Sequence, residues 1–281
     1  MRRGGSLIAA IIMALIGVIT YFSSSSKNEV TGDVQHIRIA PDQEVALGLQ
    51  AFPEMAQQFG GEITQRTVDD YVEQVGQRLV AKSDASQGPY KYDFHVLADP
   101  ETINAFALPG GQVSITVGLL KRLHNEAELA GVLGHEIGHV VARHSAAQLS
   151  KQQFAQTLVG AATIASYNPD RPGSTVQNAA IAAAIGQLVS LRFSRNDELE
   201  ADKLGVRLMK EAGYDTRGMH DLLVILEQQS QGGRTPEFFS THPNPANRLT
   251  LVDQLIAQNG GNSGGDVGAA PFQQNVLRFV K

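Results

Sequence analysis

The stretch LGHEIGHVVARH (residues 133–144) places two histidines four positions apart, with a glutamate directly after the first. On an α-helix, residues four apart differ by about 40° in direction, so His135 and His139 project side by side and can share one metal ion. Glu136 lies about 100° from His135, where it can reach a metal-bound water without binding the metal. The stretch therefore predicts a buried metal-binding helix with a general base; a partly exposed helix with incidental histidines is the alternative.

Two protein ligands are too few for a zinc site, and the best source of a third is SRNDELEADKLG (residues 194–205). Glu198 and Asp202 are four apart, so they face the same way, and like charges at that spacing repel each other on a solvated helix. A cation and an imidazole N–H placed between the two carboxylates would turn this repulsion into a net attraction. We expect Glu198 to bind the metal and Asp202 to accept the free N–H of a ligand histidine. A charged, exposed helix face is the alternative.

Two further residues of these stretches are expected to lie away from the metal. His144 comes five residues after His139, which rotates it by about 140° on a continuous helix, so it is expected at the surface or at a helix end. Glu200 points about 160° away from Glu198 and Asp202 and is expected to face solvent.

The rest of the chain predicts an α+β fold that is mainly helical. Helical patterns cover residues 40–60, 67–83 and 125–212, with a break at 167–174, and a last helix follows HPNPANR (242–248). Between residues 91 and 117 the hydrophobic residues recur at every second position, and a Pro-Gly-Gly turn separates the extended segments. This pattern predicts a small antiparallel or mixed sheet just before the HEIGH helix.

Composition limits the possible partners and ligands. The chain of 281 residues carries a formal net charge of -5, with a pI near 5.9. Nucleic acid is therefore not expected as a partner, since phosphate binding needs a basic face. Cysteine is absent, which excludes disulfides and thiolate metal ligands.

The N-terminus predicts a targeting segment. Arg2 and Arg3 precede an apolar run from Leu7 to Phe22, which is short for a spanning helix of about 20 residues, and no clear Ala-x-Ala cleavage site follows. We expect residues 1–28 to be an uncleaved signal anchor with the arginines in the cytoplasm and the catalytic domain extracytoplasmic, on the periplasmic side. A cleaved signal peptide with a free periplasmic form, or a buried core helix, is the alternative.

Two more segments complete the predicted organisation. Residues 29–258 are expected to form one catalytic domain. Residues 259–281 begin with NGGNSGGD and are expected to form a flexible Gly-rich linker and tail.

Four motifs in order, NAFALPGG, HEIGH, ELEAD and STHPNPANR, give a specific resemblance over roughly residues 35–255. The sequence resembles the HtpX/BepA and CAAX prenyl protease type of zinc metallopeptidase. The resemblance implies a gluzincin-like fold with one Zn²⁺ per chain on His135, His139 and Glu198, and Glu136 as general base. It also implies that an edge strand lines the active-site cleft and binds substrate. The substrate-binding residues of that strand would be Asn104, Ala105 and Phe106; for Asn104, a turn residue that opens the strand is the alternative.

The same resemblance places His242 beside the zinc, where it would stabilise the oxyanion or occupy the position of the water as a latch. A buried loop histidine bonded to backbone is the alternative. Arg248, six residues later, is expected to face the same pocket or to pair with Asp202.

The sequence departs from the family in two ways. Neither 154–166 nor 178–190 is long enough to span a membrane, and no long repeat domain follows. Prenylated substrates and repeat-mediated partners are therefore not expected.

The expected activity is that of a zinc metalloendopeptidase acting on extended, unfolded or misfolded protein segments. A segment would add to the edge strand through main-chain hydrogen bonds. Glu136 would take a proton from zinc-bound water and pass it to the leaving amine. The resemblance implies a role in envelope protein quality control. The alternatives are a chaperone-like binder of unfolded segments with a latched or regulatory zinc, and a zinc hydrolase of non-peptide substrates.

Overall fold

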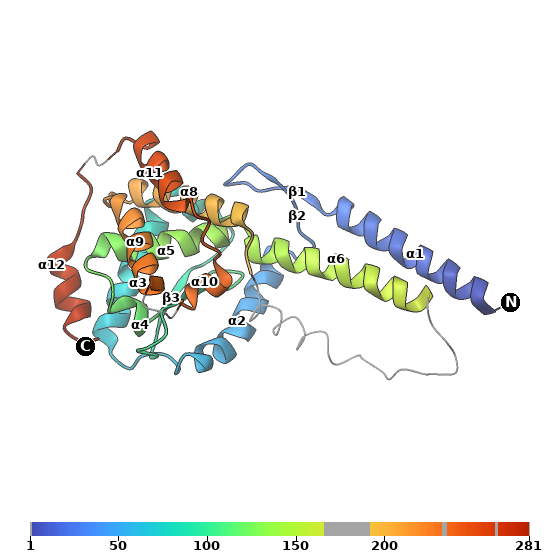
Figure 1. Ribbon diagram of the computed structural model, residues 1–281, viewed down its shortest axis with the longest axis horizontal. Helices are drawn as coiled ribbons and strands as arrows, with labels where there is room; N and C mark the ends of the chain where they lie inside the picture. The colour runs from blue at the N-terminus through green and yellow to red at the C-terminus, as the bar shows by residue number, and fades with distance from the viewer. Residues whose placement is uncertain (1, 166–191, 232–234, 262–263, 281) are drawn as a thin grey trace.

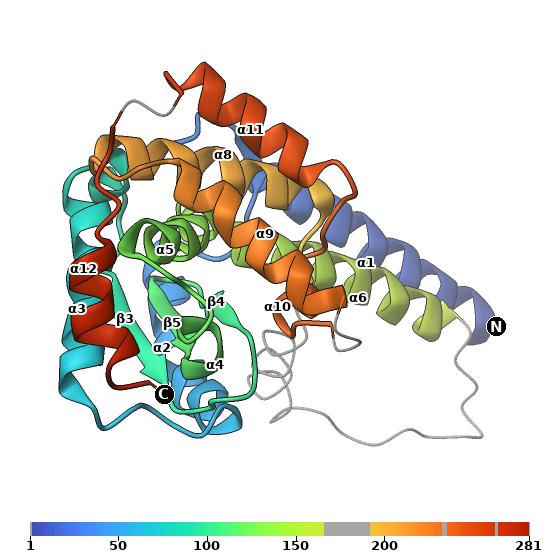
Figure 2. The ribbon, with the colours of Figure 1, turned by 60° about the vertical axis from the view of Figure 1, so that its left-hand side comes forward.

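The helix that carries HEIGH lies at the centre of the molecule. The computed structural model describes residues 2–165, 192–231, 235–261 and 264–280. The HEIGH helix is α5 (Glu126–Val141), and every one of its residues is buried. Its N-cap is Asn125, whose side chain accepts the backbone N–H of Glu128 and so satisfies one donor of the open first turn. Figure 2 shows α5 between the sheet and α8 (Arg195–Glu211), and it contacts both.

Glycines let α5 and α8 approach each other closely. A Cβ atom at Gly138 would lie 2.9 Å from the backbone oxygen of Ala201, and one at Gly134 would lie 3.3 Å from the backbone oxygen of Gly205. Larger side chains at these positions would therefore hold the two helices apart. The small residues within LGHEIGH thus bring the residues of α8 next to the two histidines.

A three-stranded sheet covers another side of α5. Strand β3 (Asp93–Leu97) runs parallel to β5 (Gln112–Thr116), and β4 (Ala105–Ala107) pairs antiparallel with β5. The order β3-β5-β4 leaves β4 at an edge, and α5 packs against this strand. The alternating pattern predicted these strands, and the glycines of the Pro-Gly-Gly turn have positive φ angles of 84° and 109°. The chain therefore has an edge strand next to the HEIGH helix.

Helices make up most of the remaining body, which confirms the mainly helical α+β fold. Helix α3 packs on β3 and α5, α9 packs on α5, and α11 packs on α8 and α9. The helical segments around α5 and α8 include α2 (Pro41–Gln58), α3 (Arg66–Ala81), the 3-10 turn η1 (Asp84–Gln87), α4 (Val117–Leu120), α9 (Arg217–Gln231), α10 (Phe238–Thr241) and α11 (Arg248–Gln258). The predicted helix break at 167–174 lies outside the described residues.

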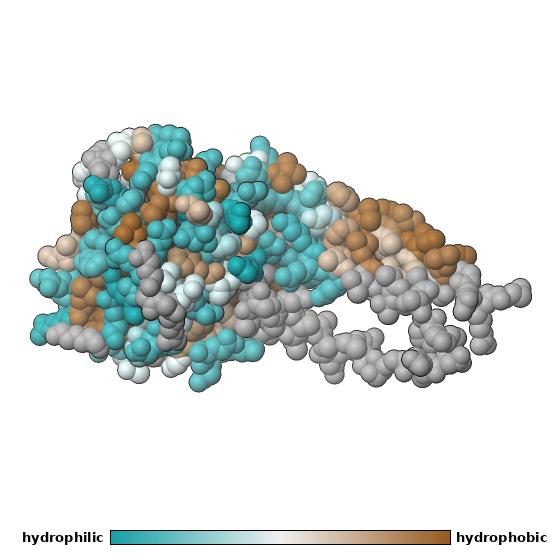
Figure 3. All heavy atoms as spheres, in the orientation of Figure 1, coloured by the Kyte–Doolittle hydropathy of each residue, from teal (hydrophilic) through white to brown (hydrophobic). Residues whose placement is uncertain are grey.

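Two long helices extend from this body side by side (Figure 1). Helix α1 (Arg2–Ser23) packs along α6 (His144–Ala165), and the short strands β1 (Ser25–Lys27) and β2 (Val34–His36) connect α1 to the body. The side of α1 that does not face α6 is apolar and exposed (Figure 3). We call it the apolar face of α1; its residues are Leu7, Ile8, Ile11, Ile12, Leu15, Ile16, Ile19 and Phe22.

Across the part of the chain that the structure describes, no helix combines the length and the apolar character needed to cross a membrane.

The C-terminal residues correct one prediction. Residues 264–280 are not a flexible tail, because they form α12 (Ala269–Phe272) and the π-helical turn η2 (Gln273–Leu277). Phe272, Val276 and Val280 follow one another at four-residue spacing and are buried in the main core. The glycines before them obscured this apolar stripe. Helix α12 contacts α5 and η2 contacts α3, so the end of the chain belongs to the body.

Candidate metal centre

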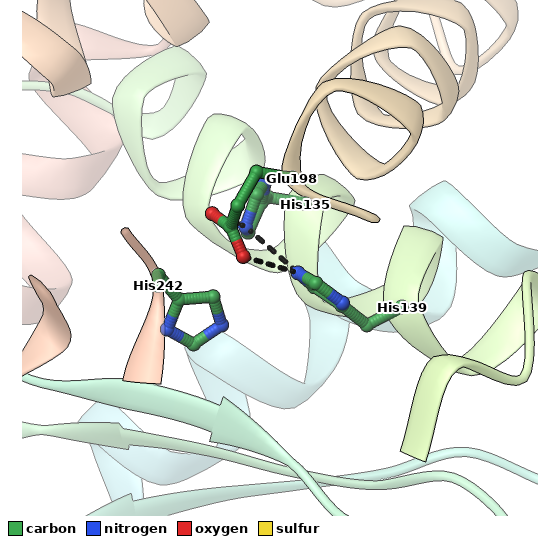
Figure 4. A group of neighbouring side chains, drawn as sticks. All are labelled: His135, His139, Glu198 and His242. Carbon is green, nitrogen blue, oxygen red and sulfur yellow. Dashed lines mark hydrogen bonds and ion pairs between the residues drawn. The ribbon is translucent and has the colours of Figure 1, made fainter. Parts of the chain in front are cut away.

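Four side chains converge beside α5 in a group that can hold a metal ion. His135 and His139 come from α5, Glu198 from α8 and His242 from the segment after α10. One potential ligand atom from each residue lies within 4.8 Å of the other three, and all four residues are buried. Figure 4 shows the four side chains facing a common point.

The distances and unpaired atoms of this group fit a cation. The Nε2 atoms of His135 and His139 lie 3.1 Å apart, and the carboxylate of Glu198 lies 3.6 Å from the first and 3.5 Å from the second. Oε1 of Glu198 and Nε2 of His242 are buried without a hydrogen-bond partner among the described residues, whereas Oε2 of Glu198 has an ion pair with Arg248. Such unpaired atoms are costly unless a ligand satisfies them. Imidazole nitrogens with one carboxylate suit Zn²⁺.

Burial sets the protonation of these groups. It lowers the pKa of His135 and, more strongly, the pKa values of His139 and His242. The three imidazoles are therefore neutral, which is the form that binds a metal. Burial also raises the pKa of Glu198 well above its ordinary value, so an ionised carboxylate at this position needs a nearby cation.

A buried ion pair stands behind the ligands. Oδ1 of Asp202 lies 2.9 Å from Nδ1 of His135, and Arg248 donates to both carboxylate oxygens of Asp202 at 2.8 Å. Burial opposes ionisation of Asp202, but the charge of Arg248 and its hydrogen bonds hold the pKa of this carboxyl below its ordinary value. Nη1 of Arg248 also lies 3.0 Å from Oε2 of Glu198. The acceptor Asp202 leaves Nε2 of His135 free to face the metal group.

Glu136 occupies a different position from the four converging residues. It is fully buried, and burial raises the pKa of its carboxyl to about 8, while the backbone N–H of Ala107 in β4 lowers it by a smaller amount. Its Oε1 atom lies 3.5 Å from Nε2 of His242. The carboxylate is thus beside the metal group and between α5 and the edge strand, without belonging to the ligand set.

The ring of His242 has a fixed orientation. It stacks on Phe238 with the ring centroids 4.2 Å apart and an angle of 9° between the ring planes. Its Nδ1 atom contacts Oγ1 of Thr241 at 2.8 Å and the backbone oxygen of Phe238 at 3.2 Å. Nε2 consequently faces both the metal group and Glu136.

A cavity of about 170 Å³ opens next to His242 and the edge strand. The three residues expected to bind substrate lie here: Asn104 and Phe106 line the cavity, and Ala105 is in β4 between them. Asn104 is buried, and its side-chain oxygen has no hydrogen-bond partner among the described residues. The other apolar lining residues are Met55, Phe59, Ala107, Leu108 and Phe193.

His144 lies at a helix end, as predicted, since it is the first residue of α6, but it does not lie away from the metal group: it is buried and touches a proposed ligand. Its Nδ1 atom lies 2.9 Å from Nδ1 of His139, and its Nε2 atom lies 3.3 Å from Oε2 of Glu200, which is half-buried. The helical rotation used for the prediction does not apply, since α5 ends at Val141 and Arg143 adopts a positive φ of 55° before α6 begins.

Phe193 is another residue of the site that sequence reasoning missed. Its ring stacks on His139 with a centroid distance of 4.0 Å, and it also lines the cavity. It precedes the N-cap Ser194 of α8, outside every motif used for the prediction.

The close crossing of a helix with two histidines and a helix with a glutamate, with a further carboxylate beside them, defines the gluzincin class of zinc metallopeptidases. The chain belongs to peptidase family M48, whose model matches residues 66–256. Peptidases of this family use zinc, and the group His135, His139, Glu198 and His242 can hold such an ion.

Curated relatives agree with this assignment. The chain is 32% identical over 215 residues to the beta-barrel assembly-enhancing protease of Yersinia pestis. The aligned region covers 74% of this chain and 43% of the relative. The chain is 33% identical over 190 residues to the protein of the same name from Escherichia coli K12, covering 64% of this chain and 37% of the relative. It is 30% identical over 257 residues to the mitochondrial metalloendopeptidase OMA1 of Schizosaccharomyces pombe, covering 90% and 71%. The chain thus spans less than half the length of these two bacterial relatives.

The two glutamates of ELEAD give a test of the ligand set. Glu198→Ala removes a carboxylate from the metal group and should lower the zinc content sharply, measured by mass spectrometry of the metal. Glu200→Ala is the matched control two residues away and should keep about one zinc per chain at saturating zinc. Reversed stoichiometries would show that Glu198 is not a ligand.

Proposed function

We propose that the chain is a zinc metalloendopeptidase that cleaves extended, unfolded protein segments bound to the edge strand β4. The observation that carries the proposal is the position of β4, which faces the HEIGH helix with one backbone edge unpaired by β5. Folded domains do not present the extended backbone that such an edge requires, whereas unfolded segments do.

The register of β4 identifies the backbone groups that would bind substrate. The N–H of Leu108 donates to the Gln112 oxygen, and the N–H of Thr116 donates to the Asn104 oxygen. Because hydrogen-bonded pairs alternate along an antiparallel ladder, the backbone groups of Ala105 and Ala107 point away from β5. Apart from the N–H of Ala107, which faces Glu136, these groups would pair with the substrate backbone, so affinity would depend little on substrate sequence.

The side chains around the cavity would complete substrate binding. The unpaired side-chain oxygen of Asn104 can accept a backbone N–H of the substrate, which supplies the partner that this buried oxygen lacks. The ring of Phe106 and its apolar neighbours line a space suited to one apolar substrate side chain.

In the proposed reaction, His135, His139 and Glu198 would hold the zinc, and Glu136 would be the general base. When bound, zinc would supply Lewis acidity, which polarises the scissile carbonyl and lowers the pKa of the attacking water. Glu136 takes a proton from the attacking water and delivers it to the leaving amine. Burial raises the pKa of this carboxyl and so its affinity for a proton, which suits a group that takes a proton from water and passes it on.

For His242 we propose a latch at rest. Its unpaired Nε2 atom belongs to the group of potential ligand atoms and also lies 3.5 Å from Glu136. In this position the imidazole would fill the place that the attacking water needs. After displacement by substrate, the same imidazole would donate a hydrogen bond to the developing oxyanion in its other neutral tautomer, with the proton on Nε2 and Oγ1 of Thr241 donating to Nδ1.

We further propose that α1 attaches the enzyme to a membrane and that it acts in envelope protein quality control. Support comes from the apolar face of α1, which the body leaves uncovered, and from the similarity to bacterial beta-barrel assembly-enhancing proteases. Exposed apolar surface of this extent is characteristic of a contact with lipid or protein. The catalytic domain would then lie on the periplasmic side.

The general base can be tested by substitution. Glu136→Gln should keep about one zinc per chain but reduce cleavage of casein by several orders of magnitude, because the amide cannot accept the proton. Zinc content and steady-state rates measured on the same preparation check this. A variant that retains zinc and cleaves at near the wild-type rate would remove Glu136 from the mechanism.

The two roles of His242 make opposite predictions. If it is a latch, His242→Ala should raise the basal cleavage of casein at equal zinc content. If its main role is to stabilise the oxyanion, turnover should fall by about 10²- to 10³-fold. The control is His220→Ala, because His220 pairs with Asp253 at the surface. Rates within about twofold of wild type would exclude both roles.

Membrane attachment can be tested without deleting α1. Ile8, Leu15 and Ile19 lie on one side of the helix and are 61%, 55% and 64% exposed. The triple substitution to Asp should abolish flotation of the full chain with liposomes, because burial of charged groups in lipid is costly. Leu49→Asp, at an exposed apolar position on α2, should leave flotation unchanged. Equal flotation of the triple variant and the wild type would refute the anchor.

A further inference from the structure

His144 is a buried histidine that the proposed mechanism does not use. It is the first residue of α6 and is 3% exposed. Its ring meets the ring of His139 edge to face, with centroids 4.9 Å apart and an angle of 71° between the planes. Its two nitrogens have different neighbours, since Nδ1 lies 2.9 Å from Nδ1 of His139 and Nε2 lies 3.3 Å from Oε2 of Glu200.

The direction of the hydrogen bond between the two histidines follows from the metal site. Nε2 of His139 faces Nε2 of His135 and the carboxylate of Glu198, so this nitrogen must be unprotonated to bind zinc. A neutral imidazole then carries its proton on Nδ1. That N–H points at Nδ1 of His144, which must accept it.

The same reasoning fixes the proton of His144. If its Nδ1 atom accepts, a neutral ring carries the proton on Nε2, and this nitrogen is the one that faces Glu200. The hydrogen bond from His144 in turn lowers the pKa of the Glu200 carboxyl. A carboxylate is a pure acceptor, so each donor along the path from His139 through His144 to Glu200 meets an acceptor.

We propose that His144 is a positioning residue that accepts the Nδ1–H of His139 and so holds this ligand in the tautomer and orientation that bind zinc. The proposal rests on the zinc site described above. It assigns different acceptors to the two ligand histidines. His135 donates to the carboxylate of Asp202, whereas His139 donates to an uncharged ring.

The position of His144 is also fixed from outside the HEIGH helix. Arg143, which interrupts the two helices, donates through Nε to Glu44 at 2.9 Å and through Nη2 to the backbone oxygen of Ile39 at 2.8 Å. These contacts hold the start of α6 against α2 and the segment before it. Phe193 packs on the ring of His139 at 4.0 Å. His139 therefore lies between an aromatic ring and an acceptor held by other parts of the chain.

The difference in acceptors has a chemical consequence for the metal. A carboxylate that accepts from a ligand imidazole makes that imidazole a stronger electron donor. A neutral imidazole acceptor does so less, because it carries no charge. The site therefore orients His139 while adding less negative charge to the metal group than a second carboxylate would.

Two substitutions separate hydrogen bonding from packing. In His144→Asn, the side-chain oxygen can take the place of Nδ1 as acceptor. In His144→Phe, an aromatic ring of similar size remains but the acceptor is lost. Zinc affinity of the full chain, measured by competition with a chromophoric chelator, should weaken about 10- to 100-fold in His144→Phe and stay within about threefold of wild type in His144→Asn. The same two substitutions at His220 are the controls and should leave the affinity unchanged.

Thermal unfolding of the metal-free proteins shows whether packing explains the result. The proposal requires that His144→Phe unfold at nearly the wild-type temperature without zinc and still bind zinc weakly. Equal zinc affinity in wild type and His144→Phe would overturn the proposal, as would equal losses in both variants accompanied by lower metal-free stability. If the wild-type protein itself fails to bind zinc, the ligand set is wrong instead.

The ring protons can also be observed directly. Nitrogen NMR of the zinc-loaded protein with ¹⁵N-labelled histidine should place the proton of His139 on Nδ1 and that of His144 on Nε2. A proton on Nδ1 of His144 would overturn the proposal, since that nitrogen could then no longer accept.

Discussion

The close contact between α5 and α8 is the constraint on which the rest of the site depends. His135 and His139 are fixed on one helix and Glu198 on the other, so the three can meet only if the two backbones nearly touch. The absence of a side chain at Gly138, where a Cβ would lie 2.9 Å from the backbone oxygen of Ala201, makes this possible. The sheet, α9 and α11 then pack around this pair of helices.

The contact between α5 and α8 also brings several charged side chains into the apolar core, where their loss of hydration is unfavourable. Asp202 and Arg248 compensate each other, and the guanidinium reaches Glu198 as well. A buried ion pair of this kind adds little to stability compared with apolar packing. Here the ion pair fixes geometry. Asp202 orients His135, and Arg248, at the start of α11, connects that helix to α8. A polar network thus occupies the centre of an otherwise apolar core, beside the group that can hold a metal ion.

Local periodicity was enough to predict much of this arrangement. The four-residue spacing of His135 and His139 placed both on one face, and the alternation around residues 91–117 gave the sheet. Those inferences needed only the geometry of single elements. His144 could not be placed in the same way, because the left-handed backbone of Arg143 and its contacts with Glu44 are tertiary features. The burial of Phe272 was missed for a similar reason, since it depends on a surface made by α3 and α5.

The pairing of α1 with α6 bears on how the enzyme would encounter its substrates. A catalytic domain on a disordered tether samples a volume set by the length of the tether. Here α1 packs along α6, a helix that begins at His144, next to the metal group. With α1 in a bilayer, the enzyme would diffuse laterally and the cleft would stay at one distance from the membrane surface. An unfolded segment would then be selected by its distance from the membrane, a criterion independent of the sequence at the cleaved bond.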